Sequence, residues 1–419
     1  MTDLLIKNAK GWINGELIDI DLRIEDGVIS EIRREIRGNF ESILDIKGKI
    51  LLPGAIDAHV HMRDGNESHK EDWLTGTSAA AAGGVTTVID QPNTDPPVTS
   101  RANLSDRIEI ASRSSLVDFL INGGVERYDN IEELYEGGVR IFGEIFLYKL
   151  EPPLLRQILD KIWGLGGIAT IHAESKHCVG KNPDRPPVCE IEGIKEVISD
   201  IVAEKLHFCH ISTPEGVDLI RSKGSITLEV TPHHLLLSRN DIDRLGGFGL
   251  MNPPLRSDRD REGLWGRLDR IDIIASDHAP HTRDEKLGDS PPPGVPGVET
   301  MLPLMLYHVK MGRIGLNRLV ELVSERPADI FGLYERGKRG ISIGADADLI
   351  VIDMRDEQVI RGDELHSKCG WTPFEGMKGI FPQITLVRGE VVYDRSSGVN
   401  LSKKGFGIFL GERLSTDLV

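Results

Sequence analysis

The sequence predicts an α/β protein: a (β/α)8 TIM barrel with a small β-sandwich formed by the N- and C-terminal segments. Three observations predict this fold. Eight apolar strands alternate with helical stretches across about 290 residues of the middle of the chain. Metal-binding residue types follow several of these strands, and the two ends of the chain share a separate, strand-rich pattern. A doubly wound open sheet is the alternative architecture.

The two ends of the chain predict the sandwich. Short apolar strands alternate with turns such as Asn14-Gly15 in the first fifty residues, and the same pattern returns at Ala347–Asp353 and Ile384–Tyr393. Because neither half is large enough to fold alone, we expect them to combine. The expected parts are a composite β-sandwich of residues 1–50 and 341–395, a catalytic barrel of residues 51–340, and a C-terminal tail of residues 396–419.

The middle of the chain supplies the barrel strands. Amphipathic or alanine-rich helical stretches such as Thr75–Ala82 and Leu154–Trp163 fill most gaps between them. In a barrel of this kind the active site lies at the carboxyl ends of the strands. The expected strands are Ile50–Arg63, Val85–Asp90, Asp118–Asn122, Val139–Phe146, Gly167–His172, Leu206–His210, Ile226–Thr231 and Asp272–Asp277.

Composition excludes several classes of function. The net charge of -16 and the pI near 5.3 argue against a nucleic-acid or anionic membrane surface. No apolar run reaches the roughly 18 residues of a membrane span, and the start of the chain lacks a signal peptide's basic segment. We therefore expect a soluble, cytoplasmic protein. The four cysteines show no C-x-x-C spacing, so we expect reduced thiols.

Ligand-type side chains gather at the predicted strand ends. His59 and His61 alternate along one strand, so both point the same way, about 6.6 Å apart. Polar side chains after apolar strands are costly unless they have partners. Nitrogen and oxygen ligands in this number predict a metal site, which we expect to hold two zinc ions because zinc suits imidazole. The further candidate ligands are Glu144, His172, His210 and Asp277.

Several motifs resemble those of one family. The sequence resembles the amidohydrolase superfamily and, within it, the dihydroorotases, and the resemblance covers nearly the whole chain. The motifs that carry it are His59-Val-His-Met-Arg63, Gln91-Pro-Asn-Thr94, His172-Ala-Glu174, Asn252-Pro-Pro-Leu-Arg256, Ser276-Asp-His-Ala-Pro-His281, Gly294-Val-Pro-Gly-Val-Glu-Thr300 and Ser367-Lys-Cys-Gly-Trp-Thr-Pro-Phe374.

The resemblance implies an activity and the roles of the metal ligands. Dihydroorotases interconvert N-carbamoyl-L-aspartate and L-dihydroorotate in pyrimidine biosynthesis. His59, His61 and Asp277 would bind one metal ion, and His172 with His210 the other. A hydroxide bridging the two ions would attack the ring amide, and Asp277 would shuttle the proton to the departing nitrogen.

Substrate recognition follows from charge. Because the substrate carries a carboxylate, Arg63 can grip it through two parallel hydrogen bonds. The family resemblance adds Asn93, Asn252 and His281 as further substrate-binding residues. The Gly/Pro-rich loop Arg283–Gly297 has the length and position of a lid or binding loop.

The sequence departs from the family at the residue that bridges the two metal ions. Many relatives carry a carboxylated lysine or an aspartate on strand four, and Val139–Phe146 contains neither. Strict alternation places Arg140 and Glu144 on one face, and of these two only Glu144 can bind a cation. We therefore favour Glu144 as the bridge, with Lys149 or no protein bridge as the alternatives. The loop that starts at Asp64 also departs from the family.

Other functions remain open at this stage. The nearest is another cyclic amidohydrolase, such as a hydantoinase or allantoinase, although its neutral ring substrate would give Arg63 no carboxylate to hold. A catalytically inactive scaffold and a metal-binding protein without catalysis are the others. The sequence leaves open a homodimer and an association with aspartate transcarbamoylase.

Overall fold

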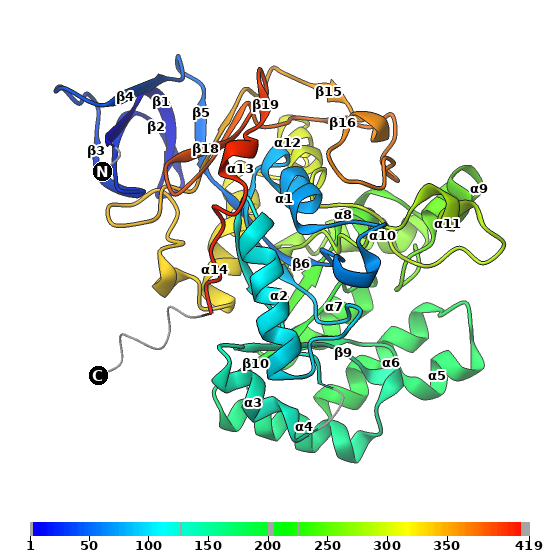
Figure 1. The fold of residues 1–419 in the computed structure, drawn as a ribbon. Coiled ribbons are helices and arrows are strands. Elements are labelled where there is room, and N and C mark those ends of the chain that lie inside the picture. The colour runs from blue at the N-terminus through cyan, green and yellow to red at the C-terminus, as the bar shows by residue number, and fades with distance from the viewer. Residues whose placement is uncertain (1–2, 126–127, 200–204, 225, 412–419) are drawn as a thin grey trace.

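The computed structural model describes residues 3–125, 128–199, 205–224 and 226–411. The two ends of the chain meet in one sheet, whose N-terminal and C-terminal strands lie together beside the barrel (Figure 1). The strand order is β19-β18-β17-β14-β5-β1-β2-β3, and β4 pairs with β1. These strands are β1 (Asp3–Ile13), β2 (Glu16–Glu25), β3 (Val28–Arg33), β4 (Ser42–Asp45), β5 (Ile50–Pro53), β14 (Leu349–Ile352), β17 (Ile384–Val387), β18 (Glu390–Asp394) and β19 (Gly398–Val399).

A closed parallel barrel forms the centre, which confirms the predicted fold class. Two parallel sheets, β6-β7-β8 and β13-β12-β11-β10-β9, are joined by the bridges Gly123↔Phe142 and Val60↔His278. The barrel strands are β6 (Ala55–Val60), β7 (Val85–Asp90), β8 (Asp118–Ile121), β9 (Ile141–Phe146), β10 (Ile168–His172), β11 (Leu206–Phe208), β12 (Thr227–Val230) and β13 (Ile273–Ile274).

Helices surround the barrel in the β-α alternation that the sequence predicts (Figure 1). Several begin at side-chain caps, as in α1, where Asp72 and Thr75 form a capping box. The helices are α1 (Trp73–Ala82), α2 (Arg101–Ser114), α3 (Asn130–Glu136), α4 (Pro152–Gly164), α5 (Lys176–Lys181), α6 (Pro187–Ile198), α7 (Pro214–Arg221), α8 (Pro232–Leu236), α9 (Ile242–Leu245), α10 (Asp258–Trp265), α11 (Arg283–Leu287), α12 (Met301–Lys310), α13 (Leu316–Val320) and α14 (Arg326–Ile330).

One expected strand divides between the two sheets. Ile50–Pro53 pairs with β1 and β14 as β5, whereas Ala55–Val60 enters the barrel as β6. Gly54 lies at the junction, where a Cβ atom would lie 2.2 Å from the Thr86 hydroxyl. Only glycine permits this close approach of the backbone, and it lets the chain pass from one sheet to the other.

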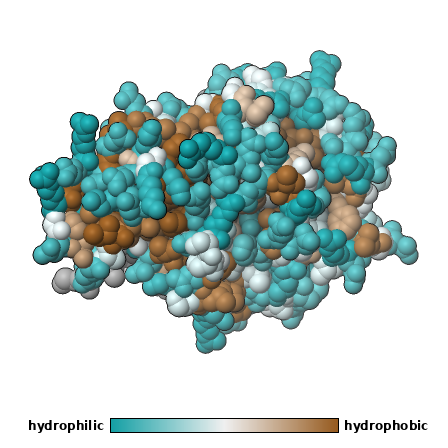
Figure 2. Space-filling view, turned by 90° about the horizontal axis from the view of Figure 1, so that it is seen from above, coloured by the Kyte–Doolittle hydropathy of each residue, from teal (hydrophilic) through white to brown (hydrophobic). Residues whose placement is uncertain are grey.

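One face of the molecule is largely polar (Figure 2), and two of the four cysteines are paired. The face in Figure 2 is mostly hydrophilic, with apolar patches between the polar side chains. Within the described ranges, no helix has the length and apolar character to cross a membrane. The expectation of reduced thiols is wrong for two cysteines, because Cys178 on α5 and Cys189 on α6 form a disulfide. The two helices bring the Cα atoms to 5.1 Å, a proximity that sequence spacing does not reveal.

Candidate functional site

The predicted site residues meet at the carboxyl end of the barrel strands, around a cavity of about 290 Å³. His59 and His210 adjoin it and are buried, and their ring centroids lie 5.3 Å apart. The structure therefore brings together every residue that the sequence analysis singled out for the site. Those that line the cavity are His61, Arg63, Asn93, Glu144, His172, Asn252, Asp277 and His281.

The histidines of strand β6 are each fixed by an oxygen acceptor. His59 Nδ1 lies 2.6 Å from Glu229 Oε1, and His61 Nδ1 lies 2.9 Å from Asn93 Oδ1. Because these oxygens accept hydrogen bonds, each Nδ1 donates to its acceptor, and each Nε2 is turned toward the other ligand-type side chains. The two Nε2 atoms face Asp277 Oδ1, at 3.6 Å from His59 and 3.3 Å from His61.

The histidine of strand β10 turns its other ring nitrogen toward the ligand cluster. His172 Nε2 lies 2.8 Å from Glu174 Oε2, which leaves Nδ1 turned toward Glu144 Oε1 at 2.7 Å. Burial opposes protonation of His172, but its hydrogen bonds with Glu144 and Glu174 raise its pKa to about 9. Burial opposes the ionisation of Glu174, but its contacts with His172 and Arg185 lower its pKa to about 2.

Glu144 lies at the centre of the cluster. Its Oε1 is 2.7 Å from His172 Nδ1 and 2.6 Å from His210 Nε2, and its Oε2 is 3.6 Å from His59 Nε2. Burial alone would raise the pKa of Glu144, but its hydrogen bonds with the histidines hold it well below the usual range. Glu144 is therefore an ionised carboxylate between the two groups of histidines.

The backbone of strand β9 is irregular before Glu144, so the side chains of this strand do not alternate strictly. The pairing of β9 with β10 shifts register between Ala169 and Ile171, and Gly143 has φ 124°. A Cβ atom at Gly143 would lie 2.3 Å from the carbonyl oxygen of Thr170. Arg140 precedes the strand and stacks on a tyrosine ring at 3.9 Å, away from the site. The glycine thus allows the irregular backbone that turns Glu144 inward.

Lys149, the alternative bridging residue, lies at the rim. It ends η2 (Leu147–Lys149), its side chain is exposed, and its Nζ is 4.4 Å from the centroid of the Phe146 ring. It lines the same cavity as Glu144 but makes no contact with a candidate metal ligand among the described residues. The geometry therefore favours Glu144 over Lys149 as the shared ligand.

Three site residues adopt the left-handed backbone region. Arg63, His210 and Asp277 have φ values of 49°, 35° and 47°. Such values are uncommon outside glycine and cost free energy that the surrounding structure must offset. Each of these residues follows a barrel strand, so the turn directs its side chain over the strand end.

The cationic part of the cavity lies beside the ligand cluster. Arg63 is 8% exposed, its Nε donates to Pro280 O at 3.3 Å, and its Nη2 lies 3.4 Å from His281 Nε2. Burial and the nearby Arg63 charge lower the pKa of His281 to about 3, so the imidazole is neutral. The side-chain oxygen of Asn93 accepts a hydrogen bond from His61, and Asn252 also lines the cavity.

Sequence reasoning missed three supporting residues. Glu229 holds His59, Glu174 holds His172, and Gln91 Oε1 accepts from the Glu144 amide at 3.0 Å. Glu229 could have been found, because it is a carboxylate within an otherwise apolar strand. Glu174 and Gln91 belong to motifs quoted above, but nothing in the sequence shows which atoms they contact.

The donor set fits metal cations. His59 Nε2 is buried without a hydrogen-bond partner, among carboxylate oxygens. Two groups of ligand atoms share Glu144: His59 with His61, and His172 with His210. Imidazole nitrogens and carboxylate oxygens at these distances must have a proton or a cation between them. Divalent metals that accept N and O ligands would satisfy all of them at once.

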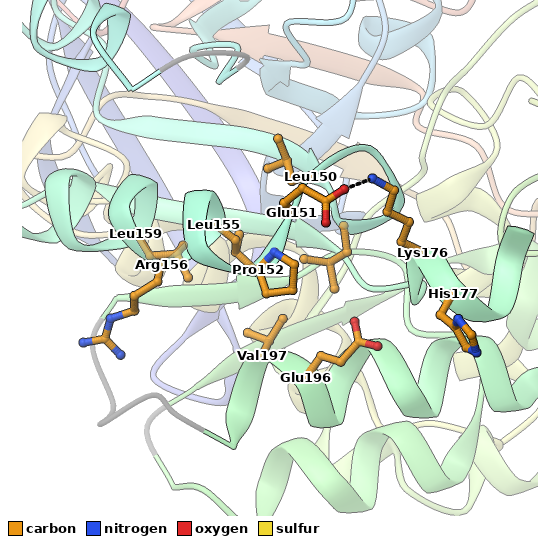
Figure 3. Close-up of a pocket in the computed structure, with 11 residues that line it drawn as sticks. Leu150, Glu151, Pro152, Leu155, Arg156, Leu159, Lys176, His177, Glu196 and Val197 are labelled. Carbon is orange, nitrogen blue, oxygen red and sulfur yellow. Dashed lines mark hydrogen bonds and ion pairs between the residues drawn. The ribbon is translucent and has the colours of Figure 1, made fainter.

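A larger cavity, of about 630 Å³, lies outside this site (Figure 3). Its wall is mainly aliphatic, with the Glu151–Lys176 ion pair at one side. The short helix η2 separates the two cavities, since Leu147 lines the outer one and Lys149 the inner one. None of the ligand groups found among the described residues lies there, so we place the chemistry in the smaller cavity.

The barrel and the cluster of histidines and carboxylates together define a metal-dependent hydrolase. The chain matches the amidohydrolase family over residues 50–392 and belongs to that family, whose members are metal-dependent. Among its relatives, a dihydroorotase of Methanosarcina mazei is 42% identical, and the alignment covers 98% of each chain. A dihydroorotase of Pyrococcus furiosus is 39% identical, covering 96% of this chain and 97% of that one.

Solved structures of similar fold carry different names. The L-hydantoinase of Arthrobacter aurescens superposes with a TM-score of 0.92 at 28% identity, covering 98% of this chain and 99% of that one. A D-hydantoinase from a Thermus species gives a TM-score of 0.88 at 27% identity, covering 97% and 98%. The fold is thus shared with hydantoinases, while the dihydroorotases are more similar in sequence.

Proposed function

We propose that this protein is a dihydroorotase, which interconverts N-carbamoyl-L-aspartate and L-dihydroorotate plus water in pyrimidine biosynthesis. One observation carries the choice among cyclic amides: the buried guanidinium of Arg63 lies in the same small cavity as the ligand cluster. A buried cation needs close anionic partners, and Glu67 Oε1 lies as far as 3.8 Å from Arg63 Nη1, so the carboxylate of dihydroorotate would supply a closer partner. The similarity to dihydroorotases at about 40% identity supports the same substrate.

The ligand cluster is proposed to hold two divalent ions, with zinc best suited to the imidazole-rich donor set. Two ions would bring hydrolytic chemistry to the site, because bound cations lower the pKa of water and polarise a carbonyl group. The proposed ligands of the first ion are His59, His61 and Asp277, those of the second are His172 and His210, and Glu144 bridges the two.

Asp277 is the proposed proton carrier. Burial would raise the pKa of its carboxyl group, but the hydrogen bond from His61 and the neighbouring histidines hold that pKa well below the usual range. Asp277 is therefore ionised and can accept a proton as water adds to the ring carbonyl. It then delivers that proton to the departing amide nitrogen as the C–N bond breaks. Ring closure follows the same steps in reverse.

The residues beside the ligand cluster are proposed to bind the carboxylate of the substrate. Arg63 donates two parallel hydrogen bonds to it, and the neutral His281 lies beside that guanidinium as a further donor or acceptor. The amide groups of Asn93 and Asn252 face the same cavity. These residues hold the ring so that its amide carbonyl meets the ligand cluster.

A hydantoinase is the second candidate, favoured by the structural similarity to hydantoinases. Neutral hydantoins would bring no carboxylate to Arg63, which would then keep only the long ion pair with Glu67 Oε1, at 3.8 Å, among the ion pairs of the described residues. Comparing kcat/KM for dihydroorotate, hydantoin and allantoin decides between them. We expect dihydroorotate to exceed the other two at least 100-fold. A preference for hydantoin or allantoin would contradict the proposal, and no turnover of any of the three by the metal-loaded protein would indicate an inactive homologue.

A variant at Arg63 sharpens this comparison. Arg63→Met should lower kcat/KM for dihydroorotate at least tenfold, because charged hydrogen bonds contribute roughly 1.5–3 kcal/mol each. It should leave the slow turnover of hydantoin nearly unchanged. Arg283→Met, which removes an exposed arginine outside the cavity, is the matched control.

A further inference from the structure

Lys286 is a buried lysine without an ion pair in the described part of the chain. It lies on the short helix α11, and its side chain is 1% exposed. Its ammonium group donates to three backbone carbonyls: Leu250 O at 3.1 Å, Pro292 O at 2.8 Å and Gly294 O at 2.9 Å. Burying a charge is costly, so an arrangement that directs three carbonyl dipoles at one ammonium calls for an explanation.

Two of the three carbonyls belong to residues that line the proposed substrate cavity, and the third lies two residues before another lining residue. Pro292 and Gly294 line that cavity, and Leu250 precedes Asn252, which lines it as well. Gly294 N donates to Leu250 O at 2.9 Å, so the two segments also contact each other. Lys286 therefore joins the loop after α11 to the segment that carries Asn252.

Close packing fixes the ammonium group in this position. A Cβ atom at Gly247 would lie 2.1 Å from the Lys286 carbonyl oxygen, so α11 packs directly on that backbone. The Trp371 ring lies on another side, 5.5 Å from Nζ. Glu285, on the same helix, is the charged group that acts on Lys286. The Lys286 charge also contributes to the low pKa of His281, which is neutral. The segments packed against the ammonium group present carbonyls and the Trp371 indole.

We propose that Lys286 is a positioning residue that fixes the outer wall of the substrate cavity by binding three carbonyls of its two segments. The identity of the substrate rests on the proposed function, whereas the positioning role rests on these contacts alone. An ammonium has three N–H donors for the three carbonyls, and a neutral amine has two. Loss of the proton therefore releases one carbonyl and loosens the wall.

Lys286 changes its protonation state within the pH range in which enzymes are commonly assayed. Burial lowers the pKa of Lys286 to about 8, against a smaller opposing effect of Glu285. Below that pH the ammonium holds all three carbonyls, and above it the amine does not. We expect KM for dihydroorotate to rise as the pH increases through about 8, with kcat changing less.

Hydrogen exchange tests the positioning role without substrate. In Lys286→Met, peptides covering residues 247–251 and 288–295 should exchange at least tenfold faster at neutral pH than in the wild type. Arg283→Met, a cation removed from the same helix, should leave these peptides unchanged. Equal exchange in wild type and Lys286→Met would overturn the proposal and leave the proposed function untouched.

Kinetics provide the second test. Lys286→Met should raise KM about fivefold or more, with kcat within about twofold, and should abolish the rise of KM above pH 8. If Lys286→Met does not fold, Glu285→Gln provides the test. Loss of the Glu285 charge should lower the pKa of Lys286, so the rise of KM should begin at a lower pH. The proposal is contradicted if KM rises at the same pH in Glu285→Gln as in the wild type, or if Lys286→Met still shows the rise of KM. If the wild type does not turn over dihydroorotate, the proposed function fails, and the exchange measurement still decides the role of Lys286.

Discussion

Two buried clusters of acidic residues lie in this molecule, and they differ in what neutralises them. In the first, Lys338 Nζ lies 2.5 Å from Asp118, 3.1 Å from Asp346 and 2.6 Å from Asp348. Arg388 adds a second cation on Asp118. This cluster joins barrel strand β8 to the segment that leads into β14. Its permanent cations come from the chain itself.

The second cluster surrounds Glu144 and carries no lysine or arginine within hydrogen-bond distance of its carboxylate among the described residues. Its carboxylates, Glu144 and Asp277, face imidazole nitrogens that are themselves acceptors when neutral. Burial opposes the charge of Lys338, but the three aspartates raise its pKa. The first cluster therefore has its own permanent cation. A structural acid cluster and a metal site can thus have similar residue composition, and they differ in whether the chain itself supplies the neutralising cation.

The largest expected effect tests the chemistry of the Glu144 cluster. Asp277→Asn keeps the shape of the side chain but removes the proton acceptor, so turnover in both directions should fall 10² to 10⁴-fold, roughly 3 to 5 kcal/mol. Dihydroorotate should still bind, as measured by calorimetry. Activity above a tenth of the wild type would show that Asp277 is not the proton carrier.

Removing the Glu144 carboxylate tests whether this side chain is the ligand that two metal ions share. Glu144→Ala should lower metal content and activity together, by about 100-fold in rate, and extra zinc should not rescue it because two cations would then repel each other. Lys149→Ala is the matched control and should keep most of its activity. Added bicarbonate should not speed metal reconstitution of the wild type. The reverse pattern would identify Lys149 as the bridging residue.

The Lys338 cluster should respond in the opposite way. Lys338→Met removes the cation that three buried aspartates share, so unfolding by denaturant should show a loss of roughly 3 to 5 kcal/mol. The metal content of the folded variant should stay at the wild-type level. Arg355→Met removes an exposed partner of Asp353 and should change stability by less than about 1 kcal/mol. Loss of metal in Lys338→Met would break the distinction between the two clusters.

The smallest effect concerns the acids that orient the histidines. Glu174→Ala removes the partner of His172 Nε2 and should weaken metal binding about 10 to 100-fold, measured by competition with a chelator. Glu196→Ala, which loses only a hydrogen bond from Ser175, is its control. Equal metal affinity in the two variants would assign Glu174 to packing rather than to ligand orientation.

Much of this arrangement could be predicted from the sequence. Apolar strands with a polar residue at the end locate His172 and Asp277, because the carboxyl ends of parallel strands meet at one edge of the barrel. Other features depend on contacts between distant segments. The disulfide of Cys178 and Cys189 requires knowing how two short helices pack, and the hydrogen bond from His59 to Glu229 joins barrel strands β6 and β12, whose two residues are 170 positions apart in the sequence.

The backbone irregularities were also beyond pattern reasoning. Alternation along β9 selected Glu144, but the register shift next to Gly143 means that strict parity does not hold through that strand. The final barrel strand is only Ile273–Ile274, so the turn with positive φ at Asp277, rather than an extended strand, positions its carboxylate. Local backbone geometry of this kind depends on tertiary packing, which a hydrophobic period does not encode.

Anomalous diffraction at the zinc edge, from crystals grown with zinc and dihydroorotate, would locate the metal ions. We expect two peaks, both in contact with Glu144, one beside His59 and His61 and the other beside His172 and His210. We expect no peak at the aspartates around Lys338. A single peak, ions bridged by Lys149 instead of Glu144, or a peak at the Lys338 cluster would contradict this expectation.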